Sequence, residues 1–341
     1  MKICYISFKL DNPRDQITLR GFKEIGVEVE VLSFDGYLKL LKDFRRLEAK
    51  IDLVMVGYAS SVLIIFLRLF TRKRIIYNAL ATFYDSMVIS RNQSLVRYWL
   101  IDFLAFSFAD KIFLECRAQK DLVVRIFKIR PEKISVHFVG TDDKQFYFDP
   151  SVPKLSQFTV VFRGMFLPEA GADIAIRAAK ELEGTGIKVR IIGRGLLKKD
   201  MENLVQELKP TNVELITEML PIEELRKKML ECHLSLGQLA NHPRVHTTIP
   251  HKVFESMAMK LPYLTGDNKG VMEFLTDGET CFTVPPGDYH ALARKILVLK
   301  DRPKELEQVA ENAYQLYQRE FTPKILAWKI LEELQGLMKK V

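Results

Sequence analysis

The chain has 341 residues, of which 48% are apolar and 28% charged, and it carries a formal net charge of +8. This composition excludes a disordered or fibrous protein and allows two domains of ordinary size. The modest positive charge suits a protein that meets phosphate groups or an anionic membrane surface, and no module typical of nucleic-acid binding accompanies it.

The start of the chain and its longest apolar run predict a cytoplasmic protein. The opening MKICYISF leads directly into a predicted strand and not into a secretory signal. The run at 60–70 is about half the length that spans a bilayer, and Arg68 interrupts it. A basic cluster follows at 71–74, so this helix has two interpretations: a core helix with a solvated end, or a helix lying peripherally on the inner membrane face. The four cysteines are interpreted as buried free thiols.

Short apolar runs alternate with helical patterns along the first half of the chain. The predicted strands are residues 2–8, 27–33, 52–57, 74–78, 111–115 and 133–138, and the predicted helices are 15–25, 36–49, 60–71 and 94–109. The pattern lapses at residues 141–157, which contain two prolines and show no periodicity. This segment is predicted to be a linker between domains.

The alternation starts again after the linker. Strands are predicted at 158–164, 187–193, 213–217, 233–236, 262–264 and 280–284, with helices at 171–183 and 196–208 among them and three helices at the end. Alternation of this kind predicts an α/β protein with two doubly wound, Rossmann-like domains, residues 1–150 and 151–320. Ligands of such sheets bind beyond the carboxyl ends of the strands, so two facing domains are expected to share a cleft.

Several catalytic motifs are absent from the sequence. The histidines and cysteines form no HExxH or CxxC pattern, which argues against a metal site. There is no GxSxG of a serine hydrolase, no Walker A loop, and no GxGxxG after the first strand. The remaining candidates are loops at the strand ends of the second half.

Two of these loops contain glycines that directly follow a predicted strand. Gly164 in FRGMFLPEAG and Gly193 in IIGRGLLKKD would let a phosphate approach the backbone, and Arg194 could donate two hydrogen bonds to it. The alternatives are a simple turn between strand and helix, and a solvated arginine.

The third candidate is the segment IPHKVFESMAMK, residues 249–260. Pro250 suits the first turn of a helix, where its missing N–H is no loss. Lys252 adds a positive charge to the anion-attracting helix start, and Glu255 could accept hydrogen bonds from a vicinal diol such as ribose. The alternative for Glu255 is a carboxylate on the helix surface.

In this order the motifs resemble those of retaining glycosyltransferases of the fourth family, which share the GT-B architecture. The resemblance covers residues 158 to 295 and rests on these segments: GMFLPEAG (164–171), GRG (193–195), KVFESMAMKLPYLTGD (252–267) and NKGVMEFLTDGETCFTVPPGD (268–288). It implies that the first domain binds an acceptor and that the second binds a nucleotide sugar. It further implies that the tail at 321–341 is a helix packing back on the first domain, with a periodic apolar stripe that consists of Ile325, Trp328, Ile330, Leu331 and Leu334.

The resemblance also implies roles for the residues of the second domain. Glu255 would hold the ribose, Gly164 would approach the diphosphate, and loop 248–252, with Thr248 and Ile249, would face phosphate and donor sugar. Transfer would retain the anomeric configuration without an established covalent nucleophile, and the departing diphosphate would help to deprotonate the acceptor hydroxyl. The resemblance therefore assigns no catalytic residue, no metal and no cofactor.

The sequence departs from the family at three positions. Thr247 replaces the first of two glutamates that are usually eight residues apart, and Met165 and Ala170 replace an arginine and a lysine that usually bind the diphosphate. Lys252 and Arg194 are the nearest substitutes for the missing cations.

Strand-end loops of the first half supply the candidate residues for the acceptor. Arg14 lies in loop 9–16, and Tyr84, Asp85 and Arg91 belong to a segment that resembles a Tyr-Asp…Arg pattern of some family members. The alternative for this segment is a surface loop whose aromatic residues cover the core.

The favoured interpretation is a metal-independent glycosyltransferase that moves a sugar from a UDP- or GDP-sugar to a glycan or a lipid-linked acceptor. Two alternatives remain open: a non-catalytic nucleotide-sugar-binding subunit of a glycosyltransferase complex, and a GT-B epimerase.

Overall fold

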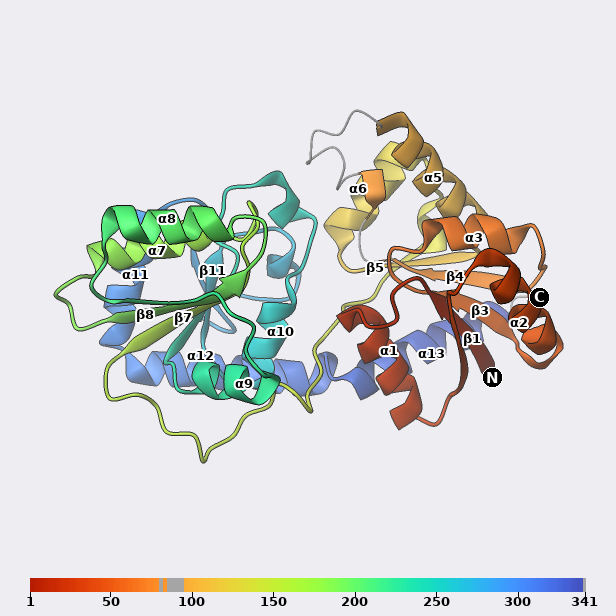
Figure 1. Ribbon diagram of the computed structural model, residues 1–341. Helices are drawn as coiled ribbons and strands as arrows, with labels where there is room; N and C mark the ends of the chain where they lie inside the picture. Colours follow the sequence, from red (N-terminus) through yellow and green to blue (C-terminus); the bar gives the residue numbers. More distant parts are fainter. Residues whose placement is uncertain (80–81, 85–94, 340–341) are drawn as a thin grey trace. The chain divides into compact units, whose positions relative to one another are not determined.

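The computed structural model describes residues 1–79, 82–84 and 95–339 (Figure 1). Contacts between residues divide the chain into two units: unit 1 contains residues 1–140 and 322–341, and unit 2 contains residues 141–321. The structure therefore places the division at 140–141, ten residues before the predicted boundary at 150, and assigns the tail to unit 1. Each unit is built on a six-stranded sheet.

The sheet of unit 1 has the strand order β2-β1-β3-β4-β5-β6, and all its pairings are parallel. Its strands are β1 (Lys2–Ser7), β2 (Glu28–Ser33), β3 (Leu53–Val56), β4 (Arg74–Asn78), β5 (Lys111–Leu114) and β6 (Ile134–Val136). The central strand β3 is buried along its whole length, as expected for a parallel strand covered on both faces, whereas the edge strand β2 is largely exposed. Each strand lies within two residues of its predicted bounds.

Helices cover both faces of this sheet. One face carries α2 (Tyr37–Leu47), α3 (Ser61–Arg68), α5 (Leu95–Phe108) and α6 (Arg117–Phe127). The other face carries α1 (Pro13–Glu24) and the tail helix α13 (Pro323–Lys339), which run side by side in Figure 1. The tail thus completes the core of unit 1, although unit 2 separates it in sequence from the rest of that core.

A close approach and a polar cluster hold α13 in place. A Cβ atom on Gly21 of α1 would lie 2.3 Å from the carbonyl oxygen of Pro323, so only glycine allows the two helices this contact. The carboxylate of Glu333 lies 2.6 Å from Nε2 of His137 and 2.7 Å from Nζ of Lys111, and it accepts a hydrogen bond from Ser135. These bonds join α13 to the ends of β5 and β6.

The apolar stripe of α13 differs from the predicted one. Ile330, Leu331 and Leu334 are buried, but Trp328 is 49% exposed and Ile325 is only partly buried. The helix instead buries Leu326 and Ala327, and Ala327 packs against the sheet and α1. Helical spacing alone predicted the helix correctly but placed Ile325 and Trp328 on its buried face.

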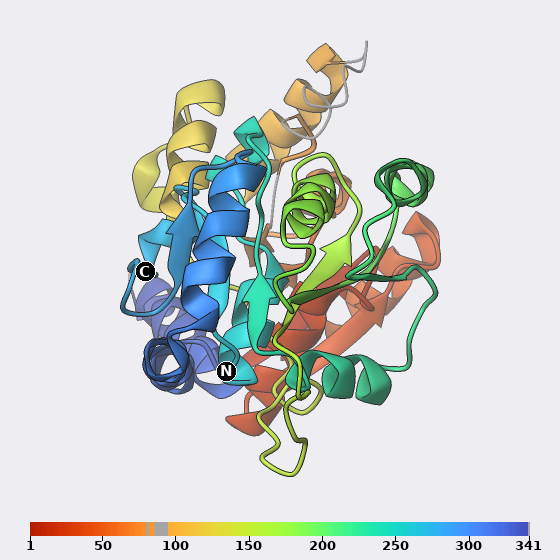
Figure 2. The same ribbon diagram turned by 90° about the vertical axis from the view of Figure 1, so that its left-hand side faces the viewer.

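The sheet of unit 2 has the order β12-β11-β10-β7-β8-β9, again with parallel pairings throughout. Its strands are β7 (Thr159–Met165), β8 (Lys188–Arg194), β9 (Val213–Ile216), β10 (Leu234–Leu236), β11 (Tyr263–Gly266) and β12 (Phe282–Val284). The helices on its two faces, seen in Figures 1 and 2, are α7 (Ala172–Glu181), α8 (Lys198–Leu208), α9 (Ile222–Leu230), α10 (His251–Ala258), α11 (Tyr289–Lys300) and α12 (Pro303–Glu320).

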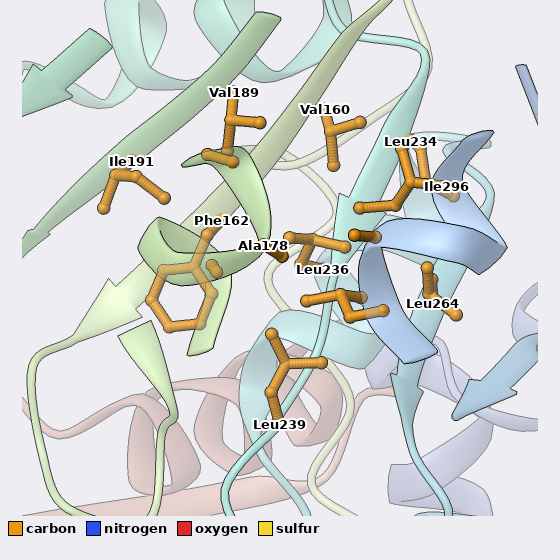
Figure 3. Packing of buried hydrophobic residues seen from close by; sticks show 14 of the residues in the cluster. Val160, Phe162, Ala178, Val189, Ile191, Leu234, Leu236, Leu239, Leu264 and Ile296 are labelled. Carbon is orange, nitrogen blue, oxygen red and sulfur yellow. The ribbon is translucent and has the colours of Figure 1, made fainter. Parts of the chain in front are cut away.

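The main core of unit 2 lies between this sheet and helices α7, α8 and α11 (Figure 3). Phe162 of β7 and Ile191 of β8 point into it, and Ala178 and Ile296 pack on it from α7 and α11. Because this core fixes β7 and β8, it also fixes the loops that follow their carboxyl ends. In the described part of the chain, no helix is long and apolar enough to cross a membrane.

Replacing Glu333 by glutamine is expected to loosen α13 and to destabilise unit 1 by about 1–3 kcal/mol. Burial alone would raise the pKa of Glu333, but hydrogen bonds from His137, Lys111 and Ser135 outweigh it and lower the pKa to about 2. The stabilisation is therefore fully present above pH 4.5, the ordinary pKa of the group, and is lost as the pH falls towards 2. Thermal unfolding and hydrogen exchange of α13 across this range measure it.

Glu332→Gln is the matched control, because it makes the same change on the exposed neighbouring residue. Equal melting temperatures for the two variants at pH 7, or a difference that persists unchanged at pH 2, would contradict the role assigned to Glu333.

Candidate functional site

The carboxyl ends of β7 and β8 bring the two predicted glycines together. The strands are parallel neighbours, and their register pairs Gly164 with Gly193 and Met165 with Arg194. In a doubly wound sheet this edge is where ligands bind. The two loops that the sequence singled out are therefore adjacent.

The two glycines have different surroundings. A Cβ atom on Gly193 would lie 2.2 Å from the carbonyl oxygen of Gly164 and 2.5 Å from the ring of Phe166, so packing within the protein accounts for this glycine. A Cβ atom on Gly164 would meet only the end of the Lys252 side chain, at 3.3 Å. Of the two, Gly164 is the one whose Cβ position lies beside the Lys252 amine.

A hollow of about 650 Å³ adjoins these strand ends. This volume falls within the range of small-molecule sites, about 300–1,000 Å³. Gly164, Gly193 and the exposed Arg194 line it, together with residues 218–222 of the loop after β9. That loop was not predicted from the sequence to be part of the site, although it also follows the carboxyl end of a strand.

Lys252 lies under the strand ends as a buried cation. It belongs to the first turn of α10, and its side chain is 6% exposed. Its Nζ donates a hydrogen bond to the carbonyl oxygen of Gly237 at 3.1 Å and lies 3.9 Å from the centre of the Phe162 ring. Burial and the nearby Arg163 lower the pKa of Lys252 to about 7, against the opposing effect of Glu255. The amine can therefore gain or lose its charge near neutral pH.

Glu255 does not lie on the helix surface; it is 4% exposed and pairs with an arginine from the sheet. Nη1 of Arg163 donates hydrogen bonds to both carboxylate oxygens, at 2.9 and 2.8 Å. Arg163 precedes Gly164 on β7, and the sequence analysis did not single it out. Burial raises the pKa of Glu255, while Arg163 and Lys252 act in the opposite direction. Arg163, Lys252 and Glu255 form what we call the charged cluster.

The charged cluster combines two chemical abilities. Its lysine and arginine can receive an anion beside Gly164, and the remaining lone pairs of its carboxylate can accept hydrogen bonds from hydroxyl groups. Two further acceptors lie at the neighbouring strand ends: Gln238 Oε1 and Asn268 Oδ1 are buried and have no hydrogen-bond partner among the described residues. Neither residue was singled out from the sequence.

The loop before α10 is ordered by its own side chains. The hydroxyl of Thr248 donates to the carbonyl oxygen of Arg244 at 3.0 Å, and Ile249 is buried. Pro250 is the residue that precedes the helix and not its first residue, and no side chain caps the helix start. The first N–H groups of α10 thus lack a side-chain acceptor from the residue before the helix.

The three departures from the family motif occupy different surroundings. Ala170 is buried, the Thr247 hydroxyl donates to Arg244 O at 3.3 Å, and Met165 is 59% exposed. Residues two apart on a strand share a face, so Arg163 stands on the same face of β7 as Met165. Arg163, which directly precedes Gly164, thus places a cation on the same face of β7 as Met165, where the family usually has an arginine.

The candidate acceptor residues of unit 1 are placed only in part. Arg14 is not in a loop but in α1, where it is buried; its Nε donates to Asn78 at 2.9 Å, and its Nη1 has no hydrogen-bond partner among the described residues. The ring of Tyr84 packs edge-on against Phe127, which matches the alternative of an aromatic residue covering the core. Asp85 and Arg91 lie outside the described residues.

The described residues contain no cluster of metal ligands, and they line a second hollow away from these strand ends. No group of three or more histidine, cysteine, aspartate or glutamate side chains in residues 1–79, 82–84 and 95–339 could hold a metal ion. A larger hollow of about 790 Å³ lies at the opposite, amino-terminal edge of the sheet of unit 2. Three of its lysines are already bonded: Lys154 to two carbonyl oxygens, Lys260 to Glu311 and Lys300 to one carbonyl oxygen.

Comparison with curated proteins finds relatives that transfer sugars, according to their names. The chain is 30% identical over 156 residues to the alpha-D-kanosaminyltransferase of Streptomyces kanamyceticus. This alignment covers 45% of this chain and 39% of that protein. It is 23% identical over 209 residues to the amylovoran biosynthesis glycosyltransferase AmsK of Erwinia amylovora. That alignment covers 60% of this chain and 51% of AmsK. The chain spans about half the length of the curated relatives it matches, or less.

Solved structures show the same fold across almost the whole chain. HepE of Anabaena, crystallised with UDP, is 17% identical with a TM-score of 0.77, over 98% of this chain and 100% of HepE. Sucrose-phosphate synthase of Thermosynechococcus elongatus is 15% identical with a TM-score of 0.80, over 100% of both chains. The two Rossmann-like domains therefore have the fold of the GT-B glycosyltransferases.

A family model matches the part of the chain that contains the charged cluster. The model is described as glycosyl transferases group 1, and it matches residues 143–316, slightly more than half of the chain and nearly all of unit 2. By this match the chain belongs to the glycosyl transferases group 1 family.

Proposed function

We propose that the protein transfers a sugar from a nucleotide-diphosphate sugar to a hydroxyl group of a glycan or a lipid-linked acceptor. The observation that carries the proposal is the charged cluster of Arg163, Lys252 and Glu255 beside Gly164, in a chain of this family. A diphosphate and a ribose need the two kinds of group that this cluster supplies, cations and a hydrogen-bond-accepting carboxylate.

The donor would occupy the carboxyl edge of the sheet of unit 2. Its diphosphate would lie at Gly164 and at the start of α10, near Lys252. Its ribose would donate hydrogen bonds to Glu255, and its base would enter the hollow lined by Arg194 and residues 218–222. Sugar hydroxyls would face Thr248 and Ile249, and Gln238 would offer a buried acceptor nearby.

The chemistry would rest on charge stabilisation. As the bond between the sugar and the diphosphate breaks, negative charge develops on the departing phosphate, and a preorganised cation stabilises it. Lys252 supplies that charge when protonated. Transfer would retain the anomeric configuration, with a phosphate oxygen taking the proton of the acceptor hydroxyl, and would need neither a metal nor a covalent nucleophile.

UDP-glucose is the first donor to test. HepE, a structural neighbour, has been crystallised with UDP and with UDP-glucose, although its identity of 17% carries only the fold to this chain. GDP-glucose is the second donor. Isothermal titration with both, followed by assays for hydrolysis and transfer, tests the proposal, which fails if neither nucleotide binds.

A non-catalytic binding subunit is the second candidate, favoured by Met165, Ala170 and Thr247 at positions where the family usually has charged residues. It and the glycosyltransferase share the binding site and differ in turnover. Slow hydrolysis of the bound donor without an acceptor favours the enzyme, because it requires that the bond between sugar and phosphate be activated. An epimerase would instead convert the donor sugar while leaving the nucleotide attached.

Lys252 predicts how donor affinity depends on pH. With a pKa of about 7 in the free protein, it is mostly charged at pH 6 and mostly neutral at pH 8. UDP-glucose keeps the same charge over this range, so its affinity should fall about tenfold from pH 6 to pH 8. Lys252→Met, which keeps the bulk of the chain over Phe162, should bind weakly at both pH values and lose the dependence. Lys199→Met on the exposed face of α8 is the control.

An unchanged pH dependence in the Lys252→Met protein would refute the role of the amine. Proton uptake provides an independent check: in wild type at pH 8, binding should take up close to one proton, measured by titration in buffers of different ionisation enthalpy.

Replacing Glu255 by glutamine is expected to weaken nucleotide binding about 10- to 100-fold, because a neutral amide accepts weaker hydrogen bonds and holds Arg163 less firmly. Glu207→Gln changes an exposed carboxylate of the same unit and should bind as wild type. Titration with UDP measures the affinities, and circular dichroism establishes that the variants are folded. Wild-type affinity in folded Glu255→Gln protein would remove this residue from the site.

A further inference from the structure

Unit 1 exposes apolar side chains at the ends of α2 and α3, beside aromatic residues that partly pack on its core. This group, here called the α2–α3 patch, consists of Tyr37, Leu38, Phe66, Leu69 and Phe70. Leu38 is 86% and Leu69 72% exposed, and both are next in sequence to ring-bearing residues. The rings form a continuous row, with centroids 4.8 Å apart between Tyr37 and Phe66 and 5.0 Å apart between Phe66 and Phe70.

The two helices explain why these side chains face outward. Helix α2 buries Leu40 and Phe44 against the sheet, which leaves Leu38 on the opposite side. Helix α3 buries Leu63, Ile64 and Leu67, and Leu69 follows after its last turn. Single exposed leucines are ordinary on protein surfaces. Here two strongly exposed leucines, Leu38 and Leu69, lie on the two helices that also carry the row of aromatic rings, which is more apolar surface than scattered single leucines expose.

Positive charge surrounds the patch. Residues 35–74 contain nine lysines and arginines and four acidic residues, a net charge of +5, and one of the four, Asp35, is paired with Lys39. Lys42 and Arg45 follow Leu38 at helical spacing on the same face of α2, and Arg72 follows Leu69; all three are exposed, and Arg45 is paired with Glu48 at 2.8 Å. The patch therefore has an apolar centre and a basic border.

We propose that the α2–α3 patch binds the protein to the surface of an anionic membrane. Leu38 and Leu69 would enter the boundary between head groups and acyl chains, Tyr37 would lie at the level of the head groups, and the basic border would contact acidic lipids. A second copy of the chain is a poorer occupant, because two identical patches would bring like charges together. The proposal extends the proposed function without depending on it, since it involves unit 1 and no donor.

Sedimentation of the full chain with lipid vesicles tests the proposal. Vesicles of phosphatidylcholine alone are compared with vesicles that also contain about 30 mol% phosphatidylglycerol. We expect at least about fivefold more protein on the anionic vesicles, and less binding at high salt, because salt screens the contribution of the basic border. Equal binding to the two kinds of vesicle, or no binding to either, would overturn the proposal.

Variants separate insertion of the leucines from simple charge attraction. Leu38→Glu/Leu69→Glu should lose binding to anionic vesicles, whereas Leu297→Glu/Val298→Glu, which adds the same charge to exposed apolar residues of α11 in unit 2, should lose little. Lys42→Gln/Arg72→Gln removes two positive charges from the border without introducing carboxylates, and it should bind anionic vesicles several-fold more weakly. Circular dichroism and thermal unfolding establish that each variant is folded.

Two results would refute the role of the patch. One is equal loss of binding in the Leu38/Leu69 variant and its α11 control. The other is a concentration-dependent dimer that the Leu38/Leu69 variant abolishes, measured by light scattering, since it would assign the patch to a second copy of the chain.

Discussion

A carboxylate in a protein interior needs a cation nearby, and at the candidate site Arg163 meets that need for Glu255. Burial opposes the charge of Glu255, so the carboxylate depends on β7 and α10 to hold Arg163 at hydrogen-bond distance from it. Lys252, one turn earlier on α10, adds a second cation that burial has made easy to deprotonate. The geometry of the site therefore depends on the packing between one strand and one helix, and through them on the core of unit 2.

The fold could be predicted from the sequence because each element carries a local signal. Strands such as β3 (Leu53–Val56) are short, apolar and bounded by polar residues, and parallel sheets bury them on both faces. The face of a helix is specified less strictly: Trp328 fits the apolar spacing of α13 and is nevertheless half exposed, while Ala327 is buried. A small residue contributes little to an apolar pattern but fits well where two helices approach closely, as at Gly21.

The position of the candidate site could be predicted from the sequence, but the contacts between its side chains could not. Gly164, Lys252 and Glu255 each follow from a rule about strand ends or helix starts. The pairing of Arg163 with Glu255 joins residues 92 positions apart, and no local pattern encodes it. In the same way Gly193, expected from its position to serve a ligand, is required by the ring of Phe166, a contact that exists only in the folded structure.

The place of α13 in the fold bears on how the molecule is made. Residues 322–341 follow all of unit 2 in the chain, so α1 alone covers its face of the first sheet while some 180 further residues are synthesised. During that interval the nascent chain presents an uncovered apolar surface to the cytosol. Chaperones that bind such surfaces would find their target in unit 1, and release from them would await the synthesis of α13.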